Sequence, residues 1–288
     1  MKKGYILVFL AASMWGSLGI FAKLLYGFNL SSFTIVFYRV FLALLLLLPY
    51  NLFRGGFTIG RKKLKFYALY GFFSIFLFYT LYFYTVKISS VSVAVLLLYT
   101  APIYSTLMGY YLFKEPITEK KALALGMVIT GVLLVVDLSG SRVTPLAVAL
   151  GLLTGVTYAL YGILAKFAVR TERPEEALFY TLAFGMLFLV PFTNFKVPLE
   201  SVPYLFALAF FPTFLGYIFY NHALREVEVS RASIVATVEP VVALILAFVI
   251  FRETLTPRQL IGAALIIGGS VIIHATESRE IEITEEPN

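Results

Sequence analysis

One short segment of this chain occurs twice, and each copy lies in an apolar run long enough to cross a lipid bilayer. Residues 15–23 read WGSLGIFAK and residues 158–166 read YALYGILAK, so both copies end in a lysine. Symmetry at a spacing close to half the chain is far longer than the period of a solenoid repeat. In membrane proteins it is typical of transporters built from two related halves.

A second match extends the repeat through the rest of each half. An offset of 138 residues aligns several pairs of identical residues, among them Tyr79 with Tyr217, Tyr82 with Tyr220, Pro102 with Pro240, and Glu115 with Glu253. The first spans align at an offset of 143 instead, so the first half carries five extra residues between these blocks. The extra residues fit the basic connection around residues 54–65.

The composition requires lipid as the solvent for most of the chain. Of its 288 residues, 60% are hydrophobic and 14% are charged, and the mean hydropathy is +0.89. A helix needs about 20 mainly apolar residues to cross the hydrocarbon core. Ten runs meet that requirement, with predicted ranges of 4–27, 32–53, 65–86, 91–113, 120–138, 145–168, 175–193, 201–224, 230–251 and 257–275.

The predicted fold class is therefore an all-α membrane protein, with ten transmembrane helices arranged as two inverted five-helix repeats. Five helices per repeat is an odd number, so the second copy enters the membrane in the opposite sense to the first. The sequence predicts a first repeat over 1–138, a second repeat over 139–275 and an acidic cytoplasmic tail over 276–288.

The distribution of lysine and arginine predicts the orientation in the membrane. With the N-terminus in the cytoplasm, fifteen of these residues fall in cytoplasmic segments and five in outer loops, while Lys23, Arg39 and Lys166 lie within spans. Positive residues favour the cytoplasmic side. We expect a multi-pass protein of the plasma membrane with both termini cytoplasmic. The net charge of +7 is then an orientation signal and not a nucleic-acid surface.

Glu239 is the acidic residue nearest the middle of a predicted span, and an acid at that depth is a candidate for function. It precedes Pro240, whose counterpart Pro102 follows Ala101, so the proline is repeated and the carboxylate is not. Both prolines are predicted hinges, because proline leaves a helical carbonyl without its donor. Glu239 could bind substrate or a coupling proton, or it could be a structural acid paired with Arg39 or a hydroxyl.

Arg39 is the matching candidate for a cation within the membrane. It could attract an anionic group of a substrate, pair with Glu239, or snorkel to the outer interface. Desolvation disfavours the charged form of a lone carboxyl, unless a cation such as Arg39 or a substrate amine compensates. The sequence leaves these alternatives open.

Other charged residues lie close to the ends of predicted spans. Lys23 and Lys166 fall there, and snorkelling to the interface is the simpler interpretation of both. Glu115 and Glu253 are also at span ends. We therefore expect these two acids to tolerate replacement by glutamine better than Glu239 does.

A set of aromatic and amide side chains could line a central cavity between the repeats. Tyr217, Tyr220 and Asn221 are spaced at i, i+3 and i+4, so they share one helical face. Further candidates for the cavity wall are Trp15, Tyr79, Tyr82, Tyr99, Tyr158 and Tyr161. Their rings would offer apolar walls and their hydroxyls hydrogen bonds. A lipid-facing position is the alternative for each ring, since 17% of all residues are aromatic.

The fifth and tenth predicted helices carry faces of small residues, with Gly131 and Gly269 at matching positions. Small residues allow helices to pack closely, either within one molecule or between two copies. The sequence therefore allows a homodimer but favours a scaffold role for these faces.

Several classes of protein are disfavoured by what the sequence lacks. It contains no G-x-x-x-x-G-K-[ST] phosphate loop, no H-E-x-x-H motif and no cysteine, and the predicted spans hold no Ser-His-Asp set or clustered metal ligands. We expect no enzyme activity, no cofactor and no metal. The expected partners are a small-molecule substrate, the lipid bilayer and a proton as coupling ion, with no nucleic acid.

Four motifs occur in paired order along the two halves. They are Trp15-Gly16 with Lys23; Arg39; Tyr99-Thr100-Ala101-Pro102 followed by Phe113-Lys114-Glu115; and Glu239-Pro240 followed by Phe251-Arg252-Glu253-Thr254-Leu255-Thr256. Together they resemble the drug/metabolite transporter superfamily, specifically its EamA-type ten-helix members. The resemblance extends to about residue 275. It implies ten helices, cytoplasmic termini, a central cavity, and export or exchange of small metabolites, often amino acids, by alternating access.

The predicted function is secondary transport of a small metabolite, such as an amino acid or derivative, in the export direction. A sugar-phosphate or nucleotide-sugar carrier of the same superfamily is one alternative, but it would need several cavity cations to hold phosphate, and Arg39 alone lies well inside. A polytopic lipid-modifying enzyme is the other alternative. Turnover of a lipid substrate would distinguish it from a transporter.

Overall fold

A computed structural model describes residues 2–138, 143–252 and 255–285, and all regular secondary structure in these ranges is helical. The first half contains α1 (Lys2–Gly16), α2 (Leu18–Tyr26), α3 (Ser32–Phe53), η1 (Arg61–Lys63), α4 (Leu64–Gly71), η2 (Phe72–Leu77), α5 (Phe78–Ile88), α6 (Val91–Leu98), α7 (Ala101–Phe113) and α8 (Glu119–Val135). The second half contains α9 (Pro145–Val169), α10 (Pro174–Leu189), η3 (Val190–Phe192), η4 (Leu199–Ser201), α11 (Val202–Leu208), η5 (Ala209–Leu215), α12 (Gly216–Ala223), α13 (Val229–Ala236), α14 (Glu239–Phe251) and α15 (Pro257–Glu285).

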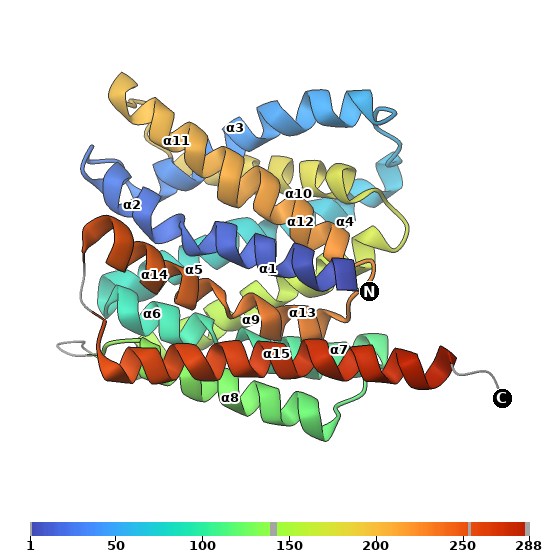
Figure 1. Cartoon of the computed structure of the whole chain (residues 1–288). Coiled ribbons are helices and arrows are strands. Elements are labelled where there is room, and N and C mark those ends of the chain that lie inside the picture. Colours follow the sequence, from blue (N-terminus) through green and yellow to red (C-terminus); the bar gives the residue numbers. More distant parts are fainter. Residues whose placement is uncertain (1, 139–142, 253–254, 286–288) are drawn as a thin grey trace.

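The helices confirm an all-α membrane protein. Within the described ranges, nine helical stretches are long and apolar enough to cross a membrane, and they correspond to nine of the ten predicted spans. The remaining predicted span, 120–138, is occupied by α8, which has 17 residues. α8 lies along α15 (Figure 1), so it belongs to the same bundle of helices.

The predicted small faces of α8 and α15 pack against each other. A Cβ on Gly131 would lie 2.7 Å from the carbonyl oxygen of Gly262, and a Cβ on Gly262 would lie 2.6 Å from that of Gly131. Only glycine allows the two backbones to approach this closely. These faces are therefore used inside the molecule.

Two spans are broken at equivalent places in the two halves. α6 and α7 are separated at Tyr99 and Thr100, and α13 and α14 at Thr237 and Val238, which is an offset of 138 residues. In α7 and α14 a proline occupies the first turn, where its missing N–H costs no hydrogen bond. The predicted hinges Pro102 and Pro240 therefore each start a half-helix.

Two other irregularities are also repeated. η2 and η5 are π-helical stretches inside the third and eighth spans, at almost the same offset. Lys114 and Arg252, which follow α7 and α14, both have left-handed backbones with φ of 61° and 55°. The two halves therefore share local backbone geometry as well as sequence.

The first span departs from the prediction of one helix over 4–27, because α1 and α2 are separated at Ser17. The backbone N–H and the hydroxyl of Ser17 both donate to the carbonyl of Met14, at 3.2 and 2.6 Å. A serine hydroxyl that bonds to the preceding turn competes with the regular helical pattern. The counterpart α9 continues without a break for 25 residues. At the other terminus, α15 continues to Glu285, beyond the predicted span end at 275.

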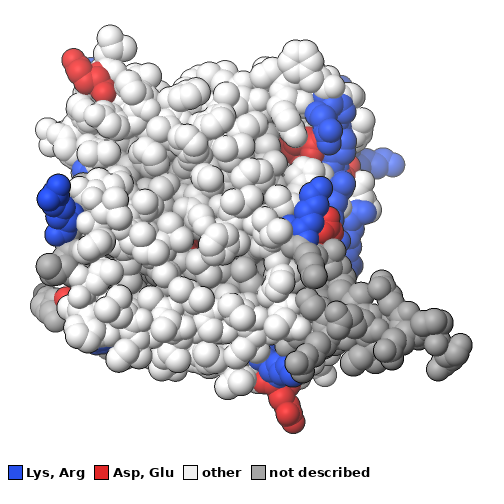
Figure 2. Space-filling view, in the orientation of Figure 1, with Lys and Arg blue, Asp and Glu red and all other residues white. Residues whose placement is uncertain are grey.

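The two ends of the helix bundle differ in charge. α1 begins and α15 ends at the same end of the bundle (Figure 1), and lysine and arginine gather mainly along that edge (Figure 2). We call this the basic end; residues that lie there include Arg54, Arg173, Lys121 and Arg225. Both termini at one end is the arrangement expected for an even number of spans.

Candidate functional site

Glu239 begins the half-helix α14 and faces hydroxyl groups from two other spans. The Tyr158 hydroxyl of α9 donates to Glu239 Oε2 at 3.5 Å, and Tyr99, at the break between α6 and α7, is a second partner of the carboxyl. Tyr99 is buried, whereas Glu239 and Tyr158 are only partly buried. A carboxylate in the first turn of a helix is also favoured by the helix dipole.

Close packing of α1 on α14 fixes the position of Glu239. A Cβ on Gly16 would lie 2.8 Å from the Glu239 carbonyl oxygen and equally close to Val242. Gly16 therefore lets α1 pass directly over the first turn of α14. Trp15 precedes this glycine, so the same contact also brings the indole ring into the centre of the molecule.

Arg39 of α3 is the buried cation of the site, with 4% of its surface exposed. Its Nε donates to Thr213 Oγ1 at 3.0 Å, and its guanidinium carbon lies 5.3 Å from the centre of the Tyr79 ring. Both Arg39 and Glu239 are described, and no ion pair joins them. The site therefore holds one cation and one acid, and each forms a hydrogen bond with an uncharged side chain.

The π-helical stretch η5 explains how Arg39 and Trp15 are held. Pro212 has no N–H, so the Leu208 carbonyl loses its helical donor, and the Thr213 hydroxyl donates to it at 3.0 Å. The Pro212 carbonyl in turn accepts from Trp15 Nε1 at 3.0 Å. The irregular backbone of this span therefore supplies fixed polar groups to the site.

Several predicted cavity residues form one aromatic layer around Trp15. Its ring centre lies 5.5 Å from that of Tyr217, 5.2 Å from that of Tyr220 and 6.5 Å from that of Tyr158. Tyr161 lies 4.9 Å from Tyr217. These rings come from both halves of the chain, so the layer lies between the two repeats.

Asn221 and Tyr82 join this group in different ways. The Tyr161 hydroxyl donates to Asn221 Oδ1 at 2.9 Å, and Asn221 is 1% exposed. Its amide oxygen therefore forms a hydrogen bond inside the protein. The Tyr82 ring stacks on Phe78 at 6.3 Å, and Phe78 contacts Tyr158 at 5.6 Å. All predicted site residues thus lie in one connected group. Their role in binding stays a prediction.

Sequence reasoning missed three residues that support this group: Thr213, Phe78 and Tyr70. The Tyr70 hydroxyl donates to the Tyr161 carbonyl at 3.2 Å. A signal was present for one of them, since Pro212-Thr213 places a hydroxyl directly after a helix-breaking residue within a span. Phe78 and Tyr70 carry no such signal, because they lie in a long aromatic run.

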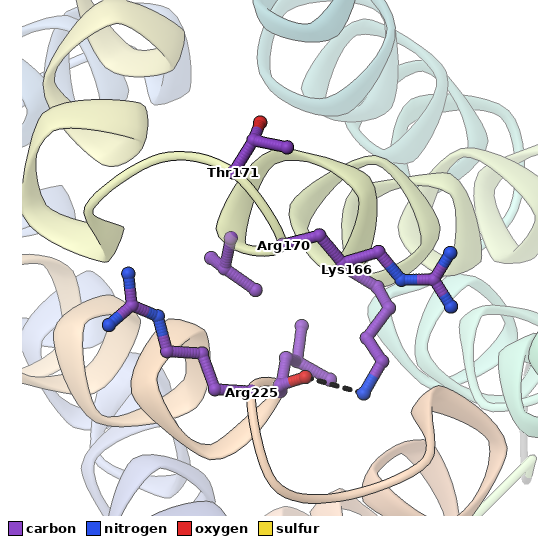
Figure 3. Close-up of a pocket in the computed structure, with 6 residues that line it drawn as sticks. Lys166, Arg170, Thr171 and Arg225 are labelled. Atoms are coloured by element: carbon purple, nitrogen blue, oxygen red, sulfur yellow. Dashed lines mark hydrogen bonds between the residues drawn. The ribbon is translucent and has the colours of Figure 1, made fainter.

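A separate pocket of ≈ 540 Å³ lies at the basic end, between the end of α9 and the end of α12 (Figure 3). It is lined by Lys166, Arg170, Arg225 and three uncharged residues. Lys166 Nζ donates to the carbonyls of Leu224 and Val227 at 2.6 and 2.7 Å. The ammonium group of Lys166 therefore binds carbonyls of the connection between α12 and α13, which differs from the expected extension of this side chain into the interface. This pocket lies apart from Glu239.

Glu115 also differs from the expectation for an acid at a span end. It is 6% exposed, and its carboxylate accepts hydrogen bonds from Val229 N, Ser230 N and Ser230 Oγ. Replacement by glutamine would lose acceptor capacity, so Glu115 is no neutral control for Glu239. Glu253 lies outside the described residues.

Comparison with known proteins identifies the family. The EamA-like transporter family matches residues 2–137 and again residues 145–275. An uncharacterized transporter of Archaeoglobus fulgidus is 31% identical over 278 residues, covering 94% of this chain and 96% of that protein. The uncharacterized transporter YyaM of Bacillus subtilis is 29% identical over 266 residues, covering 84% and 87%.

More distant similarities agree in fold and in class. A "probable amino-acid metabolite efflux pump" of Salmonella typhimurium is 27% identical over 197 residues, covering 62% of this chain and 66% of that protein. A crystal structure with 18% sequence identity superposes with a TM-score of 0.82, covering 94% of this chain and 98% of the other, which shows a common fold. The chain, with its two matching repeats, belongs to the EamA-like transporter family of the drug/metabolite transporter superfamily.

Proposed function

We propose that this protein exports a small metabolite carrying both an amine and a carboxylate, such as an amino acid or a derivative. The observation that carries the proposal is that Glu239 and Arg39 lie in one connected group and do not form an ion pair with each other. Glu239 accepts a hydrogen bond from Tyr158, and Arg39 donates one to Thr213. A substrate ammonium would pair with Glu239 and a substrate carboxylate with Arg39. The aromatic layer around Trp15 would contact the remainder of the substrate.

Two charges within a membrane protein are costly when they do not neutralise each other. A zwitterionic substrate would compensate both at once, so binding would relieve a cost already present in the empty site. A substrate with one charge would leave the other uncompensated. This difference is the basis for selectivity between amino acids and simple amines or acids.

The repeated breaks support alternating access as the mechanism. Half-helices that begin at Pro102 and Pro240 would let the repeats over 1–138 and 139–275 rock against each other, related by an axis in the membrane plane. A proton could occupy the Glu239 carboxyl when substrate leaves, which would couple transport to a proton gradient. The proposed location is the plasma membrane with both termini, including the acidic tail 276–288, in the cytoplasm.

The relative from Salmonella typhimurium described as an amino-acid metabolite efflux pump supports the substrate class and the outward direction. A phosphate-bearing substrate is less well supported. Two other buried cations, Lys121 and Arg231, lie at the basic end, where both bind Glu228. Arg39 would be left to hold a phosphate by itself.

The test is counterflow in proteoliposomes loaded with an unlabelled amino acid, followed as uptake of the same labelled compound. A thermal-shift screen of the purified protein would first select the amino acid, since a ligand that binds the folded state raises its stability. We expect the N-acetyl and methyl-ester derivatives to be poor substrates, because each lacks one charge. Equal counterflow of both derivatives would overturn the proposal.

A further inference from the structure

At the basic end, a group of residues joins the two halves of the chain. Glu115 follows α7, and its carboxylate accepts from the backbone N–H groups of Val229 at 2.8 Å and Ser230 at 3.0 Å, and from the Ser230 hydroxyl. These are the first N–H groups of α13, which have no partner within the helix. An acid of the first half therefore caps a helix of the second half.

Lys121 of α8 adds an ion pair to this cap. It is 1% exposed, and its ammonium group donates to Glu228 Oε2 at 2.7 Å, Ser230 Oγ at 3.0 Å and the Pro116 carbonyl at 2.7 Å. Glu228 also accepts from Arg231 Nε at 2.8 Å. We call the group the α13 latch; its members are Glu115, Lys121, Glu228, Ser230 and Arg231.

The backbone that directs Glu115 toward α13 is present at both ends of the molecule. Lys114 has a left-handed φ of 61°, and Arg252, its counterpart at an offset of 138, has a φ of 55°. The counterpart of Ser230 is Ser92. The half-helices α7 and α14 are therefore both followed by a left-handed residue, at opposite ends of the molecule, and the comparison between the ends depends on the side chains around these residues.

Three of the four charged members of the α13 latch have uncharged counterparts, whereas the counterpart of Glu115 is Glu253, which lies outside the described residues. At an offset of 138, three charged members correspond to uncharged residues: Lys121 to Gln259, Glu228 to Ser90, and Arg231 to Val93. Gln259 Oε1 accepts from the N–H and hydroxyl of Thr256 at 2.9 and 3.1 Å. This glutamine therefore bonds within its own half of the chain, whereas Lys121 reaches across to the other half.

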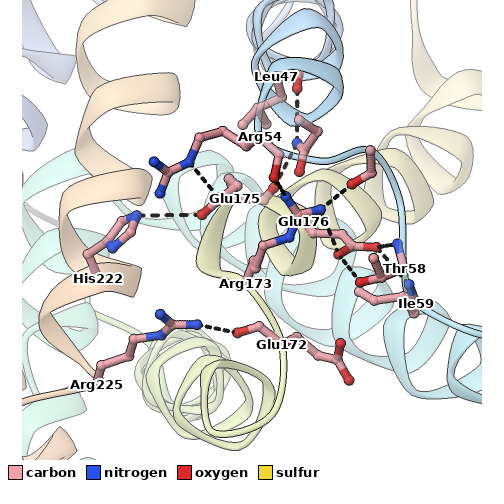
Figure 4. A network of polar contacts seen from close by, with 12 residues as sticks. Leu47, Arg54, Thr58, Ile59, Glu172, Arg173, Glu175, Glu176, His222 and Arg225 are labelled. Carbon is pink, nitrogen blue, oxygen red and sulfur yellow. Dashed lines mark hydrogen bonds and ion pairs between the residues drawn. The ribbon is translucent and has the colours of Figure 1, made fainter.

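A second pair of contacts between the halves begins with carboxylates at the basic end. Glu176 of α10 accepts from Thr58 Oγ1 at 2.8 Å and from Ile59 N at 2.7 Å, and Glu175 binds Arg54 at 3.4 Å (Figure 4). These contacts fix the connection after α3. Charged groups of the second half thus hold a loop of the first.

The equivalent loop at the opposite end is held by neutral groups. Asn194, in the connection after η3, donates its N–H to Thr34 Oγ1 of α3 at 3.1 Å. The Tyr38 hydroxyl donates to the Phe195 carbonyl at 3.1 Å. Among the described residues, carboxylates therefore hold the loop after α3 at the basic end, and uncharged hydrogen bonds of Asn194 and Tyr38 hold its equivalent. The ion pair of Lys121 with Glu228 has no counterpart in the sequence at the other end.

We propose that the α13 latch makes the two gates of this transporter unequal, so that the empty protein favours the state in which the basic end is closed. In an inverted repeat, the states open to either side are related by exchange of the repeats. Equal gates would give equal populations of the two states. Stronger contacts at one gate shift the population toward the state in which those contacts are formed.

This inference rests on the proposed transport function, because only a transporter has two gates. Its test measures the conformation of the protein and does not require transport. The chain contains no cysteine, so one introduced thiol reports on one position. Ala94 and Ala232 are equivalent at an offset of 138, and both are 0% exposed. Ala232→Cys reports opening of the basic end and Ala94→Cys opening of the opposite end. The readout is the rate of reaction with N-ethylmaleimide in detergent, measured by mass spectrometry.

With the latch intact, we expect the thiol at position 94 to react faster than the thiol at position 232. The triple variant Lys121→Gln, Glu228→Ser, Arg231→Val gives the latch the side chains of its counterpart and leaves none of these charges unpaired. It should lower the ratio of the two rates by about tenfold or more, as expected from the loss of charged hydrogen bonds. Lys120→Gln is the matched control, because it removes a charge from an exposed position of the same helix.

An unchanged ratio in a folded triple variant would overturn the inference. If the triple variant does not fold, Gln259→Lys with Ser90→Glu places the charges at the opposite end, and it should slow the reaction at position 94. An unchanged rate there would also overturn the inference. Failure of counterflow with a shifted labelling ratio would reject the transport proposal alone, whereas normal counterflow with an unchanged ratio would reject the latch alone.

Discussion

The breaks in the fourth and ninth spans have the same backbone and different chemistry. Each places a proline in the first turn of a half-helix, and each half-helix ends in a left-handed residue. At the position before the proline, one break has Ala101, which is 0% exposed, and the other has the partly buried Glu239. Duplication therefore accounts for the shape of both breaks, and the departure from symmetry marks the candidate site.

The packing around the breaks follows the same rule. Gly16 of the first half lies against the first turn of α14, and Gly155 of the second half lies against the break between α6 and α7. A Cβ on Gly155 would lie 2.9 Å from the Leu97 carbonyl and 2.5 Å from Thr100 Oγ1. Each break is thus in close contact with a glycine of the opposite repeat, so the backbones of the two repeats meet at both breaks.

The largest expected effect comes from placing an acid at the symmetric position. Ala101→Glu should prevent stable folding, because the site is fully buried and an unpaired buried charge costs about 3–5 kcal/mol. Thermal unfolding and size-exclusion chromatography of the purified protein would measure this. Glu239→Ala is the control and should remain folded. A well-folded Ala101→Glu variant would show that the two breaks are equally open.

Substitution of the supporting glycines should have the next largest effect. Gly16→Ala and Gly155→Ala should each destabilise the protein by about 1–3 kcal/mol, because the added carbon overlaps backbone of the facing span. Gly19→Ala and Gly126→Ala are matched controls, since a Cβ there meets nothing within 4 Å. If all four variants melted at the same temperature, the close contact at the breaks would be unimportant.

The smallest effect should come from a hydroxyl beside the carboxylate. Tyr158→Phe removes a donor 3.5 Å from Glu239 Oε2 and should weaken substrate binding by about 0.5–1.5 kcal/mol, seen as a rise in KM with an unchanged melting temperature. Tyr84→Phe, at an exposed position, is the control. Identical KM values for both variants would exclude a role for the Tyr158 hydroxyl in positioning Glu239.

Features that follow from local chemistry were accessible from the sequence. Apolar length predicts the spans, and proline in the first turn predicts the breaks before Pro102 and Pro240. The split at Ser17 was not accessible, because a serine within an apolar run is equally compatible with a continuous helix. The π-helical stretch η2 contains no proline from which it could be predicted, whereas η5 contains Pro212.

For the candidate site, the sequence predicted residues that the structure places together, but it did not predict their partners. Arg39 and Glu239 were candidates for a mutual ion pair, yet Arg39 binds Thr213 and Glu239 binds Tyr158. Lys166 was predicted to extend to the interface because it lies near the end of a span, but it donates to the carbonyls of Leu224 and Val227. The hydrogen-bond partners of these residues lie far away in the sequence and depend on how the helices meet in space. A residue pattern within one span does not specify how the helices meet.

The role of Glu239 in transport is tested by comparing Glu239→Gln with Glu119→Gln in counterflow at equal reconstitution. Glutamine preserves shape and hydrogen bonding, so both variants should fold, and Glu119 is an exposed acid at the start of α8. We expect Glu239→Gln to reduce the rate about tenfold or more and to remove its dependence on pH, and Glu119→Gln to change neither. A normal rate with a normal pH profile in the Glu239 variant would show that this residue is a structural acid with no part in binding substrate or a proton.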